Sequence, residues 1–293
     1  MDKVCVIGGA GFLGSHVCDE LTDAGYQVNI FDTKFSKWKR PEQVMIEGDI
    51  LDQDALNGAT KNCIAVYNFA AIADLDEALT KPFLTAQVNI LGNVMALEAC
   101  RKNGVSRFLY ASTVYVHSRN GGFYRCSKRA AEEYVEEYQR SYGLDYTVLR
   151  YGSLYGPRSD EHNGLWRIVK SALETGKVSY EGSREAMREY IHVQDAARAS
   201  VKALGKEFLN QHVVLTGQEP MRVLDLLKMI SEILGINQDI EFKEREFAGH
   251  YIRTPYSYQN KIGRKYISPM HVDLGQGLLQ LIYEIDQYKS KIS

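Results

Sequence analysis

The chain has 293 residues, of which 45% are hydrophobic and 25% charged, and its formal net charge is −2. This composition is ordinary for a soluble globular protein, and the balanced charge argues against a nucleic-acid partner or a membrane surface. The apolar run at the N-terminus is short and broken by glycines, so we expect no signal peptide, and we expect no membrane span elsewhere. The five cysteines are scattered without metal-binding spacing, which predicts reduced thiols, no metal site and a cytoplasmic location.

Up to about residue 152 the sequence alternates between short apolar runs and longer helical stretches. We expect strands at 3–8, 27–32, 44–52, 63–71, 107–113 and 145–152. We expect the helices between them to end near Gly25, to span 82–104, and to run from about 127 to 142. Such alternation is typical of a parallel sheet covered by helices on both faces. The predicted fold class is therefore α/β, with a doubly wound Rossmann-type parallel sheet.

The pattern changes after Pro157. Here we expect helices at 165–176, 221–235 and 277–290, a strand passing into a helix over 189–204, and a strand at 213–217. No repeat or low-complexity linker separates this part from the first, so the two are expected to pack together. We predict one domain over 1–152, to which 189–215 returns, and a smaller mixed domain made of 153–188 and 216–293.

A glycine-rich turn joins the first expected strand to its helix. Gly8, Gly11 and Gly14 give the spacing G-x-x-G-x-x-G. Glycines there allow unusual dihedrals and a close approach of a pyrophosphate, and the helix N-terminus offers N–H groups to phosphate. Asp32 ends the second strand, where a carboxylate can bind the adenosine ribose and repel a 2′-phosphate. The pattern predicts NAD in preference to NADP.

Four further residues are expected beside this cofactor. Phe12 and Leu13 lie within the glycine motif, where the helix begins. Asp49 and Ile50 follow the third strand, where an aspartate can meet the adenine amino group and an isoleucine can pack on the ring. The alternative for this second pair is an ordinary turn acid followed by a core residue.

Tyr124 and Lys128 lie four residues apart, so they share one face of a helix. A phenol has a pKa near 10, and a nearby ammonium that stabilises the phenolate suits it for proton transfer near neutral pH. Ser112 and Thr113 end the strand 107–113, at the edge where parallel sheets bind ligands, and one of them can hydrogen-bond a substrate oxygen. Beside a dinucleotide turn, these groups predict hydride chemistry.

Taken in order, these motifs resemble the extended short-chain dehydrogenases/reductases, in particular the sugar-nucleotide epimerases and dehydratases. The segments that carry the resemblance are GGAGFLGSH (8–16), GDILD (48–52), NFAA (68–71), VNILGNVMALEACRKNGVSRFLYAST (88–113), YRCSK (124–128), LRYGSLYGPR (149–158) and REYIHVQDAA (188–197). The resemblance implies NAD bound in the first domain and a nucleotide-diphosphate sugar in the second. It also implies a homodimer formed through the helices 82–103 and 127–142.

The resemblance further implies roles for single residues. Tyr124 would be the catalytic acid/base and Lys128 its partner, with Thr113 as the catalytic hydroxyl and Ser112 as the neighbouring alternative. The residues implied around the cofactor, besides those above, are Phe69, Ala70, Ala71, Asn89 and Tyr151. The residues implied at the substrate, besides Thr113, are Ser153, Arg188 and Arg253. The guanidinium fork of Arg188 would grip the diphosphate.

The sequence departs from the family pattern in three places. The loop before Tyr124 is short, which predicts a more open mouth to the active site. Ser153 stands where many relatives have an asparagine, and the arginine–proline–glycine–aspartate signature expected near 245–255 is missing. For Arg188 the alternative is a surface ion pair with a neighbouring glutamate.

In this family, hydride transfer from a sugar carbon accompanies removal of the hydroxyl proton by the tyrosine and gives a 4-keto sugar. Dehydratases place an Asp-Glu pair after the catalytic threonine, whereas Val114 and Tyr115 follow Thr113 here, which argues against elimination. Decarboxylation of a uronic acid has no dedicated feature. We therefore predict an NAD-dependent nucleotide-sugar epimerase acting at C4. The alternatives are an NAD(P)H-dependent 4-keto sugar-nucleotide reductase, which Asp32 disfavours, and a non-catalytic dinucleotide-sensing protein, which typically lacks the tyrosine or lysine.

Overall fold

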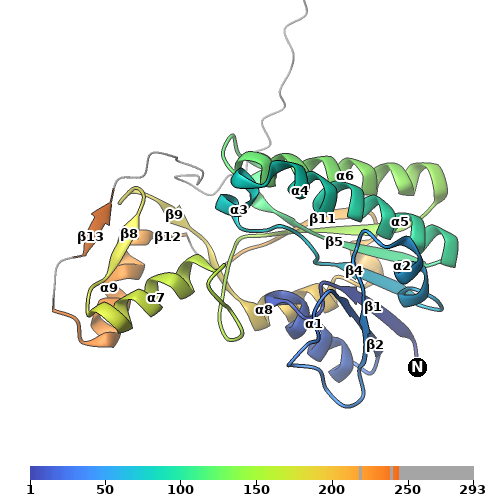
Figure 1. Ribbon diagram of the computed structural model, residues 1–293, viewed down its shortest axis with the longest axis horizontal. Helices are drawn as coiled ribbons and strands as arrows, with labels where there is room; N and C mark the ends of the chain where they lie inside the picture. The colour runs from blue at the N-terminus through green and yellow to red at the C-terminus, as the bar shows by residue number, and fades with distance from the viewer. Residues whose placement is uncertain (218–219, 238–239, 244–293) are drawn as a thin grey trace, which may run out of the picture. The chain divides into compact units, whose positions relative to one another are not determined.

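The central sheet has seven parallel strands in the order β11-β6-β5-β4-β1-β2-β3, as seen in the computed structural model, which describes residues 1–217, 220–237 and 240–243 (Figure 1). Its strands are β1 (Lys3–Ile7), β2 (Gln27–Asp32), β3 (Val44–Glu47), β4 (Ala65–Asn68), β5 (Arg107–Thr113), β6 (Asp145–Tyr151) and β11 (Gln211–Leu215). The chain runs outward from β1 to β3 and then returns to lay β4 on the other side of β1. Ligands bind such sheets at the carboxyl ends of the strands, beside this reversal.

Helices cover both faces of this sheet (Figure 1). They are α1 (Phe12–Asp23), α2 (Gln53–Ala59), α3 (Leu75–Thr80), α4 (Pro82–Ala86), α5 (Gly92–Asn103), α6 (Gly122–Tyr142) and α8 (Val193–Lys202). Helices α1 and α8 pack together on one face, while α5 packs against α2 and α6 on the other. The strands are apolar on both faces, so Phe108 and Tyr110 of β5 join the α5–α6 core, and Leu109 joins the α1–α8 core.

Helix α8 and strand β11 follow β6 in the chain and belong with the central sheet, whereas the other elements that follow β6 are mostly short. They are β7 (Ser153–Tyr155) paired with β10 (Tyr190–His192), β8 (Ser179–Glu181) with β13 (Glu241–Lys243), and β9 (Met187–Arg188) with β12 (Met221–Arg222). Helices α7 (Gly164–Thr175) and α9 (Val223–Leu234) contribute Ala172 and Leu227 to a third, separate core. The short 3₁₀ turns are η2 (Val114–His117) and η3 (Lys206–Phe208).

The predicted doubly wound sheet is confirmed, and two strands, 27–32 and 107–113, have the expected bounds. The third strand expected within 44–52 is β3, which ends at Glu47 before the polar end of that segment, whereas helices α2 and α3 were not expected. The long helical stretch expected over 82–104 is confirmed, since α4, a π-helical turn, η1 (Gln87–Leu91), and α5 follow one another from Pro82 to Asn103. Helix α6 begins at Gly122, five residues earlier than expected. The helix predicted at 277–290 lies outside the described residues, and the domain boundaries stay a prediction.

The stretch Pro82–Asn103 is long and apolar enough, by length and composition alone, to cross a membrane. However, its α5 part packs against α2 and α6 and buries Ala96, Leu97 and Cys100. Packing in the fold therefore accounts for its apolar character, since a core helix has the same composition.

Candidate active site

The glycine turn is fixed by contacts that leave no room for side chains. Gly8 has φ +77°, and a Cβ there would lie 2.5 Å from the backbone nitrogen of Ala70. A Cβ on Gly14 would lie 2.2 Å from the carbonyl oxygen of Gly8. The turn therefore packs directly on the segment that follows β4, where Phe69 and Ala70 lie, with Ala71 next along the chain.

The N-terminus of α1 is suited to bind an anion. Gly11 is its N-cap, so no side chain caps the first turn, and this turn, with Phe12 and Leu13, contains no acidic residue. Backbone N–H groups of a first turn have no helical acceptor, and the helix dipole favours negative charge there. These donors fit the pyrophosphate of a dinucleotide.

Asp32 lies beside the same turn. Its carboxylate oxygens accept hydrogen bonds from the backbone N–H of Ala10 at 3.0 Å and of Lys34 at 3.3 Å. A carboxylate oxygen has more than one acceptor site, so the group can still accept from ribose hydroxyls. Diphosphate donors and a ribose acceptor at one turn are the set that NAD requires.

Three other residues predicted around the cofactor lie at the same edge of the sheet. Asp49 is exposed and accepts from the N–H of Leu51 at 2.9 Å, while Ile50 is a buried core residue against Gly92. Asn89, within the π-helical turn, exchanges two hydrogen bonds with the backbone of Ile72, at 2.8 and 3.0 Å. Asn89 therefore fixes the loop that leaves β4.

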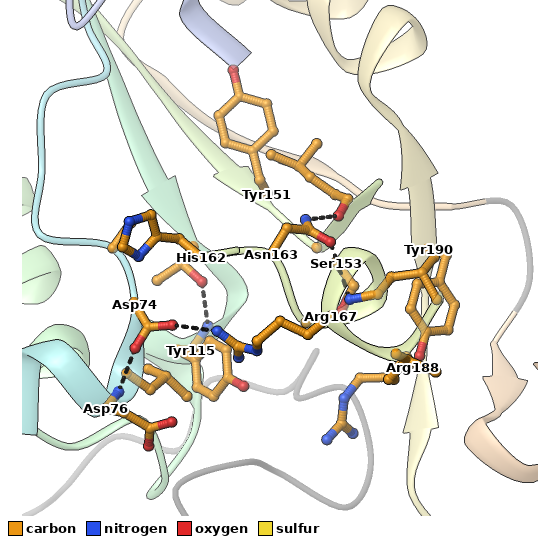
Figure 2. A pocket seen from close by; sticks show the side chains of 18 of the residues that line it. Asp74, Asp76, Tyr115, Tyr151, Ser153, His162, Asn163, Arg167, Arg188 and Tyr190 are labelled. Carbon is orange, nitrogen blue, oxygen red and sulfur yellow. Dashed lines mark hydrogen bonds and ion pairs between the residues drawn. The ribbon is translucent and has the colours of Figure 1, made fainter. Parts of the chain in front are cut away.

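A cavity of about 650 Å³ opens at the carboxyl ends of β5 and β6 (Figure 2). The predicted site residues that line it are Thr113, Tyr124, Tyr151, Ser153 and Arg188. The side chain of Thr113 lies near enough to the hydroxyl of Tyr124 to lower the pKa of that phenol. The cavity therefore brings together the predicted acid/base, its neighbouring hydroxyl and part of the predicted substrate-binding set.

The two hydroxyls at the end of β5 face opposite ways, since successive side chains of a strand alternate. Thr113 lines the cavity, whereas Ser112 is buried and donates to the carboxylate of Glu132 at 2.5 Å. Thr113 is thus the one placed to meet a ligand in this cavity.

Lys128 is buried behind Tyr124, with 3% of its surface exposed. Its ammonium donates to the carbonyl oxygen of Ala111 at 2.8 Å and lies 5.9 Å from the centre of the Tyr124 ring. Burial lowers the pKa of Lys128 to about 7, although the charge of Glu132 partly opposes this shift. Lys128 is therefore partly charged near neutral pH.

The expected lowering of the Tyr124 pKa is not observed. Burial raises its pKa to about 12, and the hydrogen bond from the Thr113 side offsets this only in part. The physical reason is that burial penalises the phenolate more than one hydrogen bond stabilises it. The phenol therefore needs more positive charge nearby than the protein alone supplies.

Glu132, one helical turn beyond Lys128, anchors a buried polar network. Its carboxylate pairs with Arg150 at 2.7 Å, and their side chains are 6% and 12% exposed. Arg150 also contacts ring nitrogens of His117 and His212, each at 3.1 Å. The network joins α6, which carries Tyr124, to the strands β6 and β11 and to η2.

Tyr151, predicted at the cofactor, and the predicted substrate-binding residues come from several elements. Tyr151 is buried at the end of β6 and shares a 2.6 Å hydrogen bond with Ser200 of α8. Ser153 begins β7, and its N–H donates to the carbonyl of Glu189 at 3.0 Å. Arg188 in β9 is buried rather than on the surface, and it donates to the carbonyl of Met187 at 2.9 Å. Arg253 lies outside the described residues.

Several lining residues were not expected from the sequence: Asp74, Asp76, Tyr115, Asn163 and Arg167. One signal was present, because Asp74 is followed three residues later by Glu77, the spacing of a capping box, and Asp74 does cap α3. Arg167 sits on α7, and its position in the sequence gives no hint of a ligand.

Residues 4–216 match the family model for the NAD dependent epimerase/dehydratase family. A relative described as a putative UDP-glucose 4-epimerase, from Methanocaldococcus jannaschii, is 28% identical over 95% of this chain and 97% of its own length.

Two solved structures are similar across most of the chain. The UDP-glucose 4-epimerase of Thermotoga maritima with UDP-glucose is 29% identical, with a TM-score of 0.80 over 87% of this chain and 90% of that one. The UDP-glucose 4-epimerase of Thermus thermophilus in complex with NAD is 27% identical, with a TM-score of 0.78 over 89% and 95%. These matches confirm the predicted cofactor, NAD, and an enzymatic activity. The chain belongs to the NAD-dependent epimerase/dehydratase family.

Proposed function

We propose that this chain is an NAD-dependent epimerase that inverts C4 of a nucleotide-diphosphate sugar through a transient 4-keto sugar. The observation that carries the proposal is that Tyr124 and Thr113 line one cavity as neighbours, with the ammonium of buried Lys128 5.9 Å from the centre of the Tyr124 ring. A phenol and an alcohol within reach of each other can both contact one substrate hydroxyl.

Tyr124 then takes the proton of the sugar hydroxyl and later returns it, while Thr113 holds the same oxygen in place. NAD, when bound, supplies a hydride acceptor and, in its oxidised form, a positively charged ring. A cation near the phenol lowers its pKa from the value of about 12 that burial imposes. The ammonium of Lys128 adds positive charge on the other side of the ring when it is protonated.

The substrate's two phosphates are assigned to Arg188, whose guanidinium suits phosphate. Ser153 lines the same cavity and would contact the sugar or its diphosphate, whereas Tyr151, also in the lining, would lie beside the cofactor. Similar proteins of known structure include one solved with UDP-glucose, which favours a uridine nucleotide here. The nucleotide base and the sugar are part of the proposal.

Epimerisation is favoured over elimination by the residues after Thr113. Val114 is buried, and Tyr115, an aromatic residue, lines the cavity, so η2 offers no carboxylate to the sugar. Asp32 beside the glycine turn disfavours NADPH, and with it a net reductase.

The test is a proton NMR assay with the purified protein and UDP-, GDP-, CDP- and dTDP-sugars. We expect interconversion of C4 epimers of at least one of them, with no net change in the absorbance of reduced cofactor. Consumption of NADPH with a keto-sugar would instead identify a reductase, and a 4-keto-6-deoxy product would identify a dehydratase.

We also propose a homodimer formed through 82–103 and α6. Large apolar side chains on these helices are exposed, and those on the two segments are Phe83, Leu84, Leu91, Phe123, Tyr134 and Tyr142. Light scattering with size-exclusion chromatography tests this, since a molar mass near that of one chain, 33.2 kDa, would contradict it.

A further inference from the structure

An ion pair crosses the cavity that Tyr124 also lines. Arg167 of α7 donates from Nη1 to Oδ2 of Asp74 at 3.1 Å, and to the carbonyl oxygen of Glu161 at 2.8 Å. Figure 2 shows the Arg167 side chain extending across the cavity to Asp74. The two residues are 93 positions apart in the chain, so the pair joins opposite walls of the site.

The two carboxylate oxygens of Asp74 have separate tasks. Oδ1 accepts from the backbone N–H groups of Asp76 and Glu77 at 2.9 and 3.0 Å and so caps α3, whereas Oδ2 accepts from Arg167. Burial opposes the charged form, but the hydrogen bonds from Glu77, Arg167 and Asp76 outweigh it and lower the pKa of Asp74. Asp74 is therefore an anion at neutral pH.

This pair lies toward the reacting end of the cavity. Asp74, Asp76 and Tyr115 lie on one side of it, and Arg188 and Tyr190 lie on the other (Figure 2). The ring of Tyr115 meets the edge of the Tyr124 ring, with centroids 6.4 Å apart. A sugar that reaches Tyr124 therefore comes close to Asp74, while its diphosphate extends toward Arg188.

Among the described residues that line the cavity, both arginines already have a partner or an assigned role. The acids are Asp74, Asp76 and Glu181, the arginines are Arg167 and Arg188, and the remaining basic side chain is that of His162. Arg188 is assigned to the diphosphate, and Arg167 is already paired with Asp74. A sugar carboxylate would lose water there without gaining a cation, and it would approach two aspartates.

We propose that the Asp74–Arg167 pair selects an uncharged sugar and rejects a uronic acid, a choice of substrate class that rests on the proposed epimerase function. Asp74 neutralises Arg167, which could otherwise bind a sugar carboxylate. Removal of the Asp74 charge would release that guanidinium toward the substrate.

The test uses the NAD-loaded enzyme and two probes that differ in charge at C6, UDP-glucose and UDP-glucuronate. Affinity is measured by calorimetry and turnover by NMR. For the wild-type enzyme we expect both affinity and turnover to favour UDP-glucose over UDP-glucuronate by at least about tenfold. The reason is that like-charge contacts cost more than about 1.4 kcal/mol.

The decisive variant is Asp74→Asn, because asparagine keeps the Oδ1 acceptor that caps α3 and loses the Oδ2 acceptor for Arg167. We expect it to shift the preference toward UDP-glucuronate by about tenfold or more. Arg167→Gln, which removes the cation instead, is expected to increase the discrimination against UDP-glucuronate.

The matched control is Asp52→Asn. Asp52 caps α2 through the same kind of hydrogen bonds, to the N–H groups of Asp54 and Ala55 at 3.0 Å each, and does not line the cavity. We expect its preference to equal that of the wild type. A wild type that binds both sugars equally, or an unchanged ratio in Asp74→Asn, overturns the inference. Selective binding without turnover would sustain this inference and contradict the epimerase function.

Discussion

The two sides of the active site are built by different means. On the sheet side, the glycine turn and the start of α1 bring backbone groups to the cofactor position, and Gly8 and Gly14 admit no side chain. On the side of α7 and β9, the cavity wall consists of side chains, among them Arg167 and Arg188. The residues predicted at the cofactor therefore depend on the backbone of the fold, whereas those proposed at the substrate act through their side chains.

Two ion pairs near the site differ in how far their side chains are exposed. Glu132 and Arg150 are 6% and 12% exposed beneath the catalytic strand, whereas Asp74 and Arg167 are 11% and 46% exposed in the cavity. Breaking a buried pair leaves an uncompensated charge in a medium that solvates it poorly, while water solvates an exposed one.

The largest expected effect on stability is therefore that of Glu132→Gln. It leaves Arg150 without its carboxylate, and we expect the free energy of unfolding to fall by about 3–5 kcal/mol. Urea denaturation measures this. Glu133→Gln, at an exposed position on the same helix, is the control and should change little. A loss below about 1 kcal/mol for Glu132→Gln would mean that the pair behaves as a surface pair.

The backbone-built side is tested next by Gly14→Ala. The added Cβ would lie 2.2 Å from the carbonyl oxygen of Gly8, so the turn must shift. We expect a destabilisation of about 1–3 kcal/mol, together with weaker NAD binding in a fluorescence titration. Gly58→Ala, in α2 with nothing within 4 Å of its Cβ, should instead stabilise by about 0.5–1 kcal/mol. Tight NAD binding in Gly14→Ala would show that the turn does not hold the cofactor.

A pH-dependent effect is expected at Lys128. Its pKa is about 7 in the fold, below its ordinary value of 10.5, so between these pH values the unfolded chain binds more protons than the native protein. The buried, protonated Lys128 lowers the free energy of unfolding, and this loss disappears as the pH rises through this window. The free energy of unfolding therefore increases by up to about 1.4 kcal/mol per pH unit.

Lys128→Met removes this titration. We expect its stability relative to wild type to be highest near pH 6 and to fall toward pH 10, as measured by urea denaturation at several pH values. A difference that is independent of pH would show that Lys128 is not held in a desolvated site.

The smallest effect is expected for the exposed pair. Arg167→Gln should change the free energy of unfolding by less than about 1 kcal/mol, because solvent and salt screen the Arg167 charge. Thermal unfolding of the wild type and this variant measures the difference. A loss as large as that of Glu132→Gln would remove the distinction between the two sides of the site.

The features that could be predicted from the sequence are those that depend on residues near one another in the chain. Strands β2 and β5 and the glycine turn were predictable because apolar runs and glycine spacing are local signals. The π-helical turn at 87–91 was not, since it accompanies hydrogen bonds of Asn89 to Ile72 and to Ser127 of α6. The raised pKa of Tyr124 and the lowered pKa of Lys128 both depend on burial. The Asp74–Arg167 pair depends on the contact of two segments that are distant in the chain. These features arise only when the chain has folded.

The most direct measurement of the central claim is the turnover of Tyr124→Phe with a nucleotide sugar that the wild type epimerises. The substitution removes only the phenolic oxygen that exchanges the proton. We expect kcat to fall by about 10²–10⁴-fold, while bound NAD and the affinity for the sugar nucleotide stay close to wild type. Turnover within a few-fold of wild type would contradict the claim that Tyr124 is the acid/base.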